Sequence, residues 1–273
     1  MRTSIIGPSE NLRPFVHHYW VMQTEGWGMT MNIMPVGCMK WMFHRRRPLI
    51  VNGIVDTSMV ATVCGCNSRA THVQSDGATH LLFVFFQPYV SKMVRGMPCE
   101  SFFEDNVDME ALDDSGFKLL KRQVLESASD AEAIRYIEKF LIQQLSTHYD
   151  AFLHRRLSAV YYTMLHHPCI DVERLADVAC LSNRQFRRVF SDNAGIAPKR
   201  LQRIHRFYRA TQMMLHMDSN DFSPIIYKLG YTDHSHFNKE FHQIAGMSPS
   251  EYMKHIEQLR QHYVLDGYQS YHQ

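Results

Sequence analysis

The sequence predicts an α+β protein: a β-rich N-terminal barrel or half-barrel, two following helices, and an all-α C-terminal domain. This last domain is predicted to hold two helix-turn-helix units joined by a connecting helix. Short apolar and β-branched runs separated by turn signals predict strands through residues 1–105. Apolar residues at helical spacing predict helices over 106–150, and one pattern that occurs twice predicts the paired units. We therefore expect one domain over 1–150, β-rich over 1–105 and helical over 106–150, and a second domain over 151–273.

The strands of the first domain are predicted from runs that fit a pleated, half-buried surface. These runs are Val16–Met22, Met31–Met34, Cys38–Phe43, Leu49–Val55, Met59–Cys64 and His80–Phe86. Asn52-Gly53 is a strong turn signal within this part of the chain. The two amphipathic helices are predicted over Leu112–Ser127 and Asp130–His148.

The repeated pattern pairs residues of the same kind at one spacing. Phe186 and Phe237 are 51 positions apart, and so are Phe190 and Phe241. In each copy the two phenylalanines are four residues apart, which places both on the same face of a helix. The spacing predicts that each pair packs into the core of its own unit.

Each copy of the pattern reads as a short helix, a tight turn and a second helix with exposed polar and basic positions. The units are predicted over residues 171–195 and 223–246, with Cys180 and Gly230 at equivalent places in the turns. The predicted helix starts are at Asp171, Ser182, Ser223-Pro224 and Asp233. Ala194-Gly195 is predicted to end the second helix of the first unit. A helix from Pro198 to about Met217 is expected to connect the units. Two units in tandem favour a protein that reads two successive major grooves of DNA.

Composition is that of a globular protein, with 45% hydrophobic and 21% charged residues and a net charge of +2. The charge is uneven: residues 151–273 hold 15 Lys and Arg against 11 Asp and Glu, a net of +4. The basic excess therefore lies in the half that carries the repeat. The longest apolar run, Leu81–Phe86, is far shorter than a membrane span, and we expect no membrane partner and a cytoplasmic location.

The second unit carries the most specific motif of the chain. It runs from Gly230 to Phe241 and is followed by Ala245-Gly-Met-Ser-Pro249 and Tyr252. With the first unit, this stretch resembles the DNA-binding domain of the AraC/XylS family of bacterial transcription regulators over about residues 154–256. The first unit departs from the family at Cys180, where relatives commonly carry glycine. A residue with a Cβ atom at that place takes on the cost of a left-handed backbone or changes the turn.

The resemblance also implies which residues contact DNA. An arginine can donate to both N7 and O6 of guanine, and an asparagine can bond both N6 and N7 of adenine. By position in the motif, the expected base contacts are Asn183, Arg184, Arg187 and Arg188 in the first unit and His234, Ser235, Asn238 and Lys239 in the second. Arg203 and Arg206 on the connecting helix are expected to contact phosphate.

The implied partners are double-stranded promoter DNA, RNA polymerase if the protein is an activator, and a small-molecule effector at the N-terminal domain. A homodimer through that domain is a further option. Aromatic side chains of the first domain are candidates to line an effector pocket, although such residues more often fill a barrel core. The candidates are Trp20, Trp41, Phe43, Phe83 and Phe85.

No set of residues indicates catalysis, a metal site or a cofactor, so we do not expect an enzyme. The contrasting hypothesis is a DNA alkyl-repair enzyme, which needs a reactive thiolate held by zinc. The closest cysteine pair, Cys64-Gly-Cys66, lacks the two-residue spacing of a zinc knuckle. A third hypothesis is a regulator that binds no ligand and is controlled by a protein partner.

Overall fold

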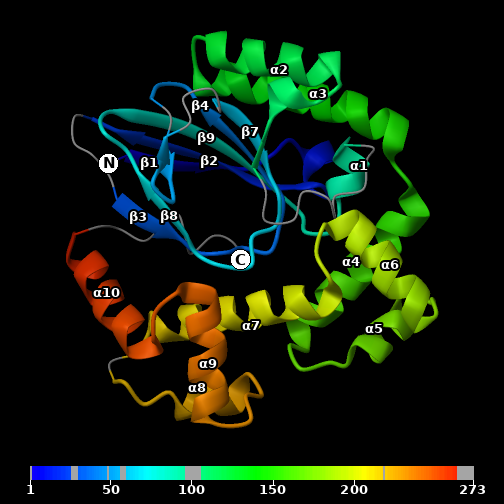
Figure 1. The fold of residues 1–273 in the computed structure, drawn as a ribbon. Helices are drawn as coiled ribbons and strands as arrows, with labels where there is room; N and C mark the ends of the chain where they lie inside the picture. The colour runs from blue at the N-terminus through cyan, green and yellow to red at the C-terminus, as the bar shows by residue number, and fades with distance from the viewer. Residues whose placement is uncertain are drawn as a thin grey trace.

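The computed structural model of this chain describes residues 2–25, 30–47, 49–55, 60–95, 106–217 and 219–262. The predicted fold class is confirmed: a β-rich N-terminal part is followed by two helices and then by an all-helical part (Figure 1). Cys99 and Met59 lie outside the described residues.

A six-stranded antiparallel sheet is the centre of the N-terminal part, with strand order β1-β2-β9-β4-β7-β10. Its strands are β1 (Arg2–Ile6), β2 (Val16–Thr24), β9 (Thr79–Phe86), β4 (Lys40–His44), β7 (Ala61–Cys64) and β10 (Asn106–Asp108). Four of them correspond to predicted strands, and β1 and β10 were not predicted. Both of the additional strands lie at the edges of the sheet, where β1 is largely exposed and β10 is half-buried.

A smaller antiparallel sheet has the strand order β3-β8-β5-β6. Its strands are β3 (Thr30–Ile33), β8 (Thr71–Gln74), β5 (Ile50–Val51) and β6 (Ile54–Val55). The run predicted over Leu49–Val55 is a hairpin, because Asn52 and Gly53 both have positive φ angles, of 49° and 79°. Two successive residues with positive φ make the tight turn that matches the twist of a hairpin.

The two faces of the larger sheet have different partners, because side chains alternate along each strand. On one face, Trp41 packs edge-on against Phe117 of α2 (Ser115–Glu126), with ring centroids 5.4 Å apart, and against Phe140 of α3 (Asp130–His148). Figure 1 shows both helices covering this face. On the other face, Phe83 shares an apolar cluster with Val73 of the smaller sheet. The two sheets therefore enclose one core, as a half-barrel does.

The all-helical part carries the two predicted units. Its helices are α4 (Ala151–His166), α5 (Val172–Val178), α6 (Asn183–Ala194), α7 (Pro198–Met214), α8 (Ser223–Lys228), α9 (His234–Ala245) and α10 (Pro249–His262). The connecting helix α7 ends at Met214, earlier than the predicted Met217. Ser223 is the first residue of α8 and not its cap; the cap position belongs to Phe222.

The two parts of the chain share apolar cores. A short helix, α1 (Ser91–Arg95), contributes Val94 to the same cluster as Phe190 of α6. In the loop before β4, Met34 packs into the cluster that holds Phe207 of α7 and Phe241 of α9. The N-terminal part thus contacts both helix-turn-helix units, and their placement depends on this packing.

Gly37 tests the contact between that loop and α7. It has a φ of +70°, and a Cβ atom there would lie 2.6 Å from Cδ1 of Leu201, a fully buried residue. Gly37→Ala combines a left-handed backbone penalty with overpacking of the junction, and we expect unfolding free energy to fall. Gly53→Ala is the matched control, because Gly53 has a φ of +79° and open space at its Cβ position.

Chemical denaturation of both variants separates the two effects. We expect Gly37→Ala to lose about 1–3 kcal/mol more than Gly53→Ala, the usual cost of overpacking a core. Equal losses would mean that the loop and α7 are not packed as described.

Candidate nucleic-acid interface

The first helix-turn-helix unit consists of α5, a turn and α6. Cys180 in the turn has a φ of 50°, so of the two expected alternatives this residue takes on the left-handed backbone. Ser182 caps α6 in a capping box with Gln185, in which each side chain bonds the other residue's backbone N–H. Gly195, with a φ of 70°, ends the helix as predicted.

The second unit, α8, a turn and α9, has the same construction. Gly230 in the turn has a φ of 65°, and Gly246 after α9 has a φ of 73°. The Asp233 side chain caps α9 by accepting a 2.7 Å hydrogen bond from the backbone N–H of His236. Phe237 is fully buried, like its counterpart Phe186 in α6. The equivalence of the two units that the spacing predicted is therefore present in their turns, caps and cores.

The residues expected to contact bases lie on one side of α6 and one side of α9, opposite the buried phenylalanines. In α6, Arg184, Arg187 and Arg188 are exposed and Asn183 is half-buried. In α9, all four expected residues are exposed: His234, Ser235, Asn238 and Lys239. Both helices thus present polar and basic side chains to solvent in the first two turns, where the N-terminal residues of such a helix reach base edges.

Two of these side chains are held by a small network in the first unit. Arg187 Nε donates a 2.9 Å hydrogen bond to Asn183 Oδ1, and Asn183 Nδ2 donates a 2.9 Å bond to Glu173 of α5. Arg187 also lies 3.5 Å from the Glu173 carboxylate. The network restrains the Asn183 amide and the Arg187 guanidinium, and contact with a base would have to replace their bonds to Glu173.

Arg203 and Arg206 of α7 lie against α9. Both guanidinium groups bond the carboxylate of Glu240, which is only 6% exposed, with N–O distances of 2.9 Å from Arg203 Nε and 2.6 Å from Arg206 Nη2. Arg206 also stacks over the Tyr231 ring, 4.5 Å from its centroid. These contacts fasten α9 to the connecting helix, a role that the sequence did not indicate. Phosphate contact by either arginine stays a prediction.

The β7–β8 loop, residues 65–70, bonds both units at once. The Cys66 thiol donates to the backbone carbonyl of Ala194 at the end of α6, with Sγ and O 3.3 Å apart. The backbone N–H of Ala70 donates to the carbonyl of Ile244 near the end of α9, at 2.8 Å. One loop of the N-terminal part therefore holds the C-terminal ends of both exposed helices.

The five aromatic residues expected to line an effector pocket do not form one wall. Trp41 and Phe43 belong to the core between the sheet and the helices. Trp20, Phe83 and Phe85 face the half-barrel interior, where Trp20 and Phe83 stack with ring centroids 5.3 Å apart. Strand alternation separates the two groups onto opposite faces of the sheet.

The cysteines among the described residues are all free thiols. Cys38, Cys64 and Cys66 are buried, and burial raises the pKa of the Cys64 thiol, which opposes formation of a reactive thiolate. In the ranges that the structure describes, no three His, Cys, Asp or Glu side chains are grouped so that they could hold a metal ion. Nor does any described helix combine the length and the apolar character that crossing a membrane requires.

Two family models match the chain. A helix-turn-helix domain model of the AraC type matches residues 175–255, which include both turns and both exposed helices. A model described as a domain of unknown function (DUF6597) matches residues 4–108, which include both sheets.

Curated relatives match this chain over part of its length. The RCS-specific HTH-type transcriptional activator RclR of Escherichia coli is 34% identical over 112 residues, 39% of this chain and 38% of that protein. The lactose operon transcription activator of Staphylococcus xylosus is 33% identical over 87 residues, 32% of this chain and 31% of that protein. The chain thus covers less than two fifths of the length of these relatives.

Among solved structures, ToxT from Vibrio cholerae is similar to this chain with a TM-score of 0.44. The identity is 12%, over 86% of this chain and 97% of that one.

Cys180 provides a stability test of the first turn. A left-handed backbone costs an L-residue about 1–2 kcal/mol, and glycine removes this cost while losing more entropy on folding. We expect Cys180→Gly to raise the free energy of unfolding by roughly 0.5–1 kcal/mol. Cys180→Ala keeps the Cβ atom and serves as the control, with no comparable gain. If the glycine and alanine variants unfold at the same denaturant concentration, the turn is not strained.

Proposed function

We propose that this chain, whose residues 175–255 form a helix-turn-helix domain of the AraC type, is a sequence-specific transcription regulator of promoter DNA. The observation that carries the proposal is the pair of equivalent exposed helices, α6 and α9, fixed on one scaffold. Each presents polar and basic side chains at its N-terminal end, and each would occupy one of two successive major grooves.

Base readout in the first groove would depend on arginine and asparagine. Arg184, Arg187 and Arg188 are exposed on α6 and can each donate two hydrogen bonds to guanine. Asn183 and Arg187 would exchange their bonds to Glu173 for bonds to base edges. In the second groove, Asn238 and Lys239 of α9 would take the equivalent places, with His234 and Ser235 near the helix start.

Phosphate contacts would fix the register of both helices. Arg203 is about one third exposed and can reach solvent while one edge of its guanidinium bonds Glu240. Arg206 is 11% exposed and is enclosed by Glu240 and Tyr231. We therefore assign the phosphate role to Arg203, and to Arg206 the task of positioning α9.

Control would come from the N-terminal domain over residues 1–150, whose β7–β8 loop bonds the ends of both α6 and α9. A small-molecule effector would act by favouring one arrangement of the two units, and only as far as it binds the two arrangements unequally. The chain would act in the cytoplasm as an activator that contacts RNA polymerase, without catalysis of its own. A homodimer through the N-terminal domain would place two copies of the helix-turn-helix domain on one promoter.

DNA binding is the direct test of this proposal. A site recovered from random-sequence DNA by selection with the full-length protein is labelled, and binding is followed by fluorescence anisotropy across a salt series. We expect affinity to exceed that for scrambled DNA and to fall steeply with salt. Arg184→Ala in α6 and Lys239→Ala in α9 should each weaken site binding, by roughly 5- to 100-fold for a residue that reads a base.

Arg155→Gln is the matched control for these variants, because Arg155 is exposed on α4 outside both units. Its affinity for the site should stay close to that of the unchanged protein. Two results would contradict the proposal: the protein selects no DNA sequence, or the Arg184 and Lys239 variants bind the selected site as tightly as the unchanged protein.

The two arginines of α7 should behave differently. Arg203→Gln should weaken binding to all sequences alike and reduce the slope of log K against log salt by about 1, as expected for one lost phosphate contact. Arg206→Met should leave that slope unchanged and lower the free energy of unfolding, because the buried Glu240 carboxylate loses its closest partner. A reduced slope for the Arg206 variant would show that Arg206 contacts phosphate.

A further inference from the structure

Glu173 lies beside the N-terminal end of α6, although it belongs to α5. Its Oε1 accepts a 2.9 Å hydrogen bond from Nδ2 of Asn183, the first residue of α6, and lies 3.5 Å from Nη2 of Arg187, one turn further along that helix. Figure 1 shows α5 beside α6, and the two helices are in contact. The Glu173 side chain is 65% exposed. An acidic group is therefore placed among the side chains that the proposed function gives to base contact.

The Glu173 side chain carries a negative charge at neutral pH. A hydrogen bond from its own backbone N–H and one from the Asn183 side chain hold the pKa of this carboxyl below its ordinary value. An ionised carboxylate has acceptor oxygens and no donor. In the free protein, Asn183 supplies a donor and Arg187 supplies an opposite charge.

Contact of Asn183 and Arg187 with bases would release the Glu173 carboxylate on the DNA side of the first unit. Phosphate groups repel it, and N7 and O6 of guanine and O4 of thymine are acceptors, as it is itself. The donors of the major groove are N6 of adenine, which an asparagine pairs with, and N4 of cytosine, which an acidic side chain pairs with. Specificity of this kind comes from repulsion of the wrong bases as well as from the bond to the right one.

The second unit has a different residue at the equivalent position. Cys180 and Gly230 occupy the same place in the two turns, 50 residues apart, which pairs Glu173 with Ser223. Ser223 is also exposed near the start of its helix, α8. A serine hydroxyl is uncharged and can both donate and accept, so it tolerates any base. A requirement for cytosine therefore belongs to the first unit.

We propose that Glu173 is a specificity-determining residue of the first unit and accepts a hydrogen bond from the N4 amino group of a cytosine. The role of Glu173 rests on the proposed function, because it needs α6 in the major groove. Asn183 and Arg187 are four residues apart, which is about 6 Å along a helix, and base pairs are about 3.4 Å apart. Glu173 bonds Asn183 and lies further from Arg187, so its cytosine should be in another base pair, within two pairs of the guanine that Arg187 contacts.

The experiment measures the affinity of the full-length protein for its selected site and for single base-pair changes in the half of the site that α6 covers. Arg187→Ala identifies the guanine, as the position where this variant loses its preference. Replacing the cytosine should weaken binding of the unchanged protein by roughly 5- to 100-fold, the usual cost of one mismatched pair. Fluorescence anisotropy at one fixed salt concentration gives each dissociation constant, because affinity for DNA depends on salt.

Glu173→Gln keeps the shape of the side chain, removes its charge and adds an N–H donor, so that it can bond any base. We expect this variant to bind the site and its cytosine-substituted forms with affinities within about threefold of one another, less than one neutral hydrogen bond contributes. Asp177→Asn is the matched control, because Asp177 is exposed on the same helix and the change removes the same charge. It should keep the full preference for cytosine. Both side chains are exposed, so both variants should fold.

Three results would overturn the role of Glu173: no preference for cytosine within two base pairs of that guanine, a full cytosine preference in Glu173→Gln, or an equal loss of preference in Asp177→Asn. The last result would show that the net charge of α5 sets the preference. A protein that selects a site but gives one of these results loses only the role of Glu173. A protein that selects no DNA sequence contradicts the proposed function itself.

Discussion

The spacing between α6 and α9 depends on the β7–β8 loop, which bonds the ends of both helices. Each helix ends at a glycine with a left-handed backbone. The last carbonyl groups of any helix have no partner further along the helix, and they need donors from elsewhere. Cys66 and Ala70 supply donors to a carbonyl near each end, at Ala194 and Ile244. The N-terminal domain is therefore part of the structure that sets the separation of the helices, and any change in its position reaches both of them.

A second constraint acts within the all-helical part, where the buried Glu240 carboxylate joins α9 to α7. A carboxylate that is 6% exposed needs charged partners, and Arg203 and Arg206 provide them from adjacent turns of the connecting helix. This ion cluster fixes how α9 is rotated and hence which of its side chains face outward. The ion cluster and the β7–β8 loop together fix the separation and orientation of α6 and α9. A surface that is already ordered loses less entropy when it binds a partner.

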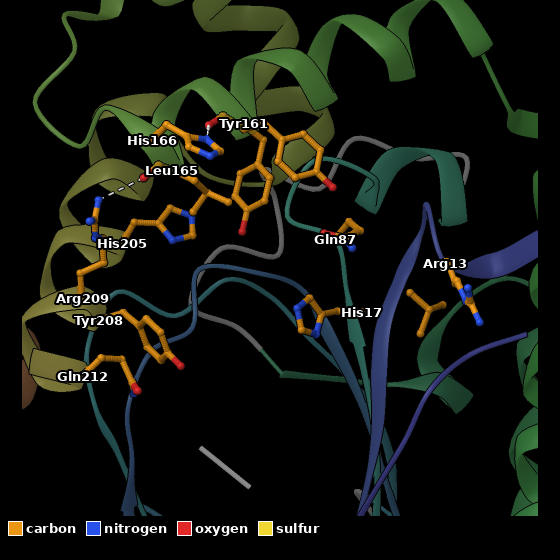
Figure 2. Close-up of a pocket in the computed structure, with 12 residues that line it drawn as sticks. Arg13, His17, Gln87, Tyr161, Leu165, His166, His205, Tyr208, Arg209 and Gln212 are labelled. Carbon is orange, nitrogen blue, oxygen red and sulfur yellow. Dashed lines mark hydrogen bonds between the residues drawn. The ribbon is translucent and has the colours of Figure 1, made fainter. Parts of the chain in front are cut away.

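Features that depend on local sequence patterns, such as helix caps, could be predicted. Contacts that form only when distant elements pack together could not. Asp233 and Ser182 were correctly predicted as caps, because their spacing to the following helix is itself the signal. The short polar strand Thr71–Gln74 has too weak an alternation to be recognised. In the sequence, Arg206 does not differ from the other basic residues of α7. Its ion pair with Glu240 forms only when α9 packs against α7, so the sequence could not indicate it. A cavity lined by residues from both parts of the chain, among them Arg13 and Arg209, was also beyond prediction, because these residues are far apart in the sequence (Figure 2).

We propose that α6 and α9 occupy two successive major grooves on one face of DNA. Methylation-protection footprinting measures this directly, because dimethyl sulfate attacks N7 of guanine in the major groove. With the full-length protein on its selected site, we expect two protected patches centred one helical turn apart, roughly 10 base pairs. Arg184→Ala should remove protection in one patch and Lys239→Ala in the other. A single protected patch, or two patches that both variants affect equally, would show that α6 and α9 do not occupy separate grooves.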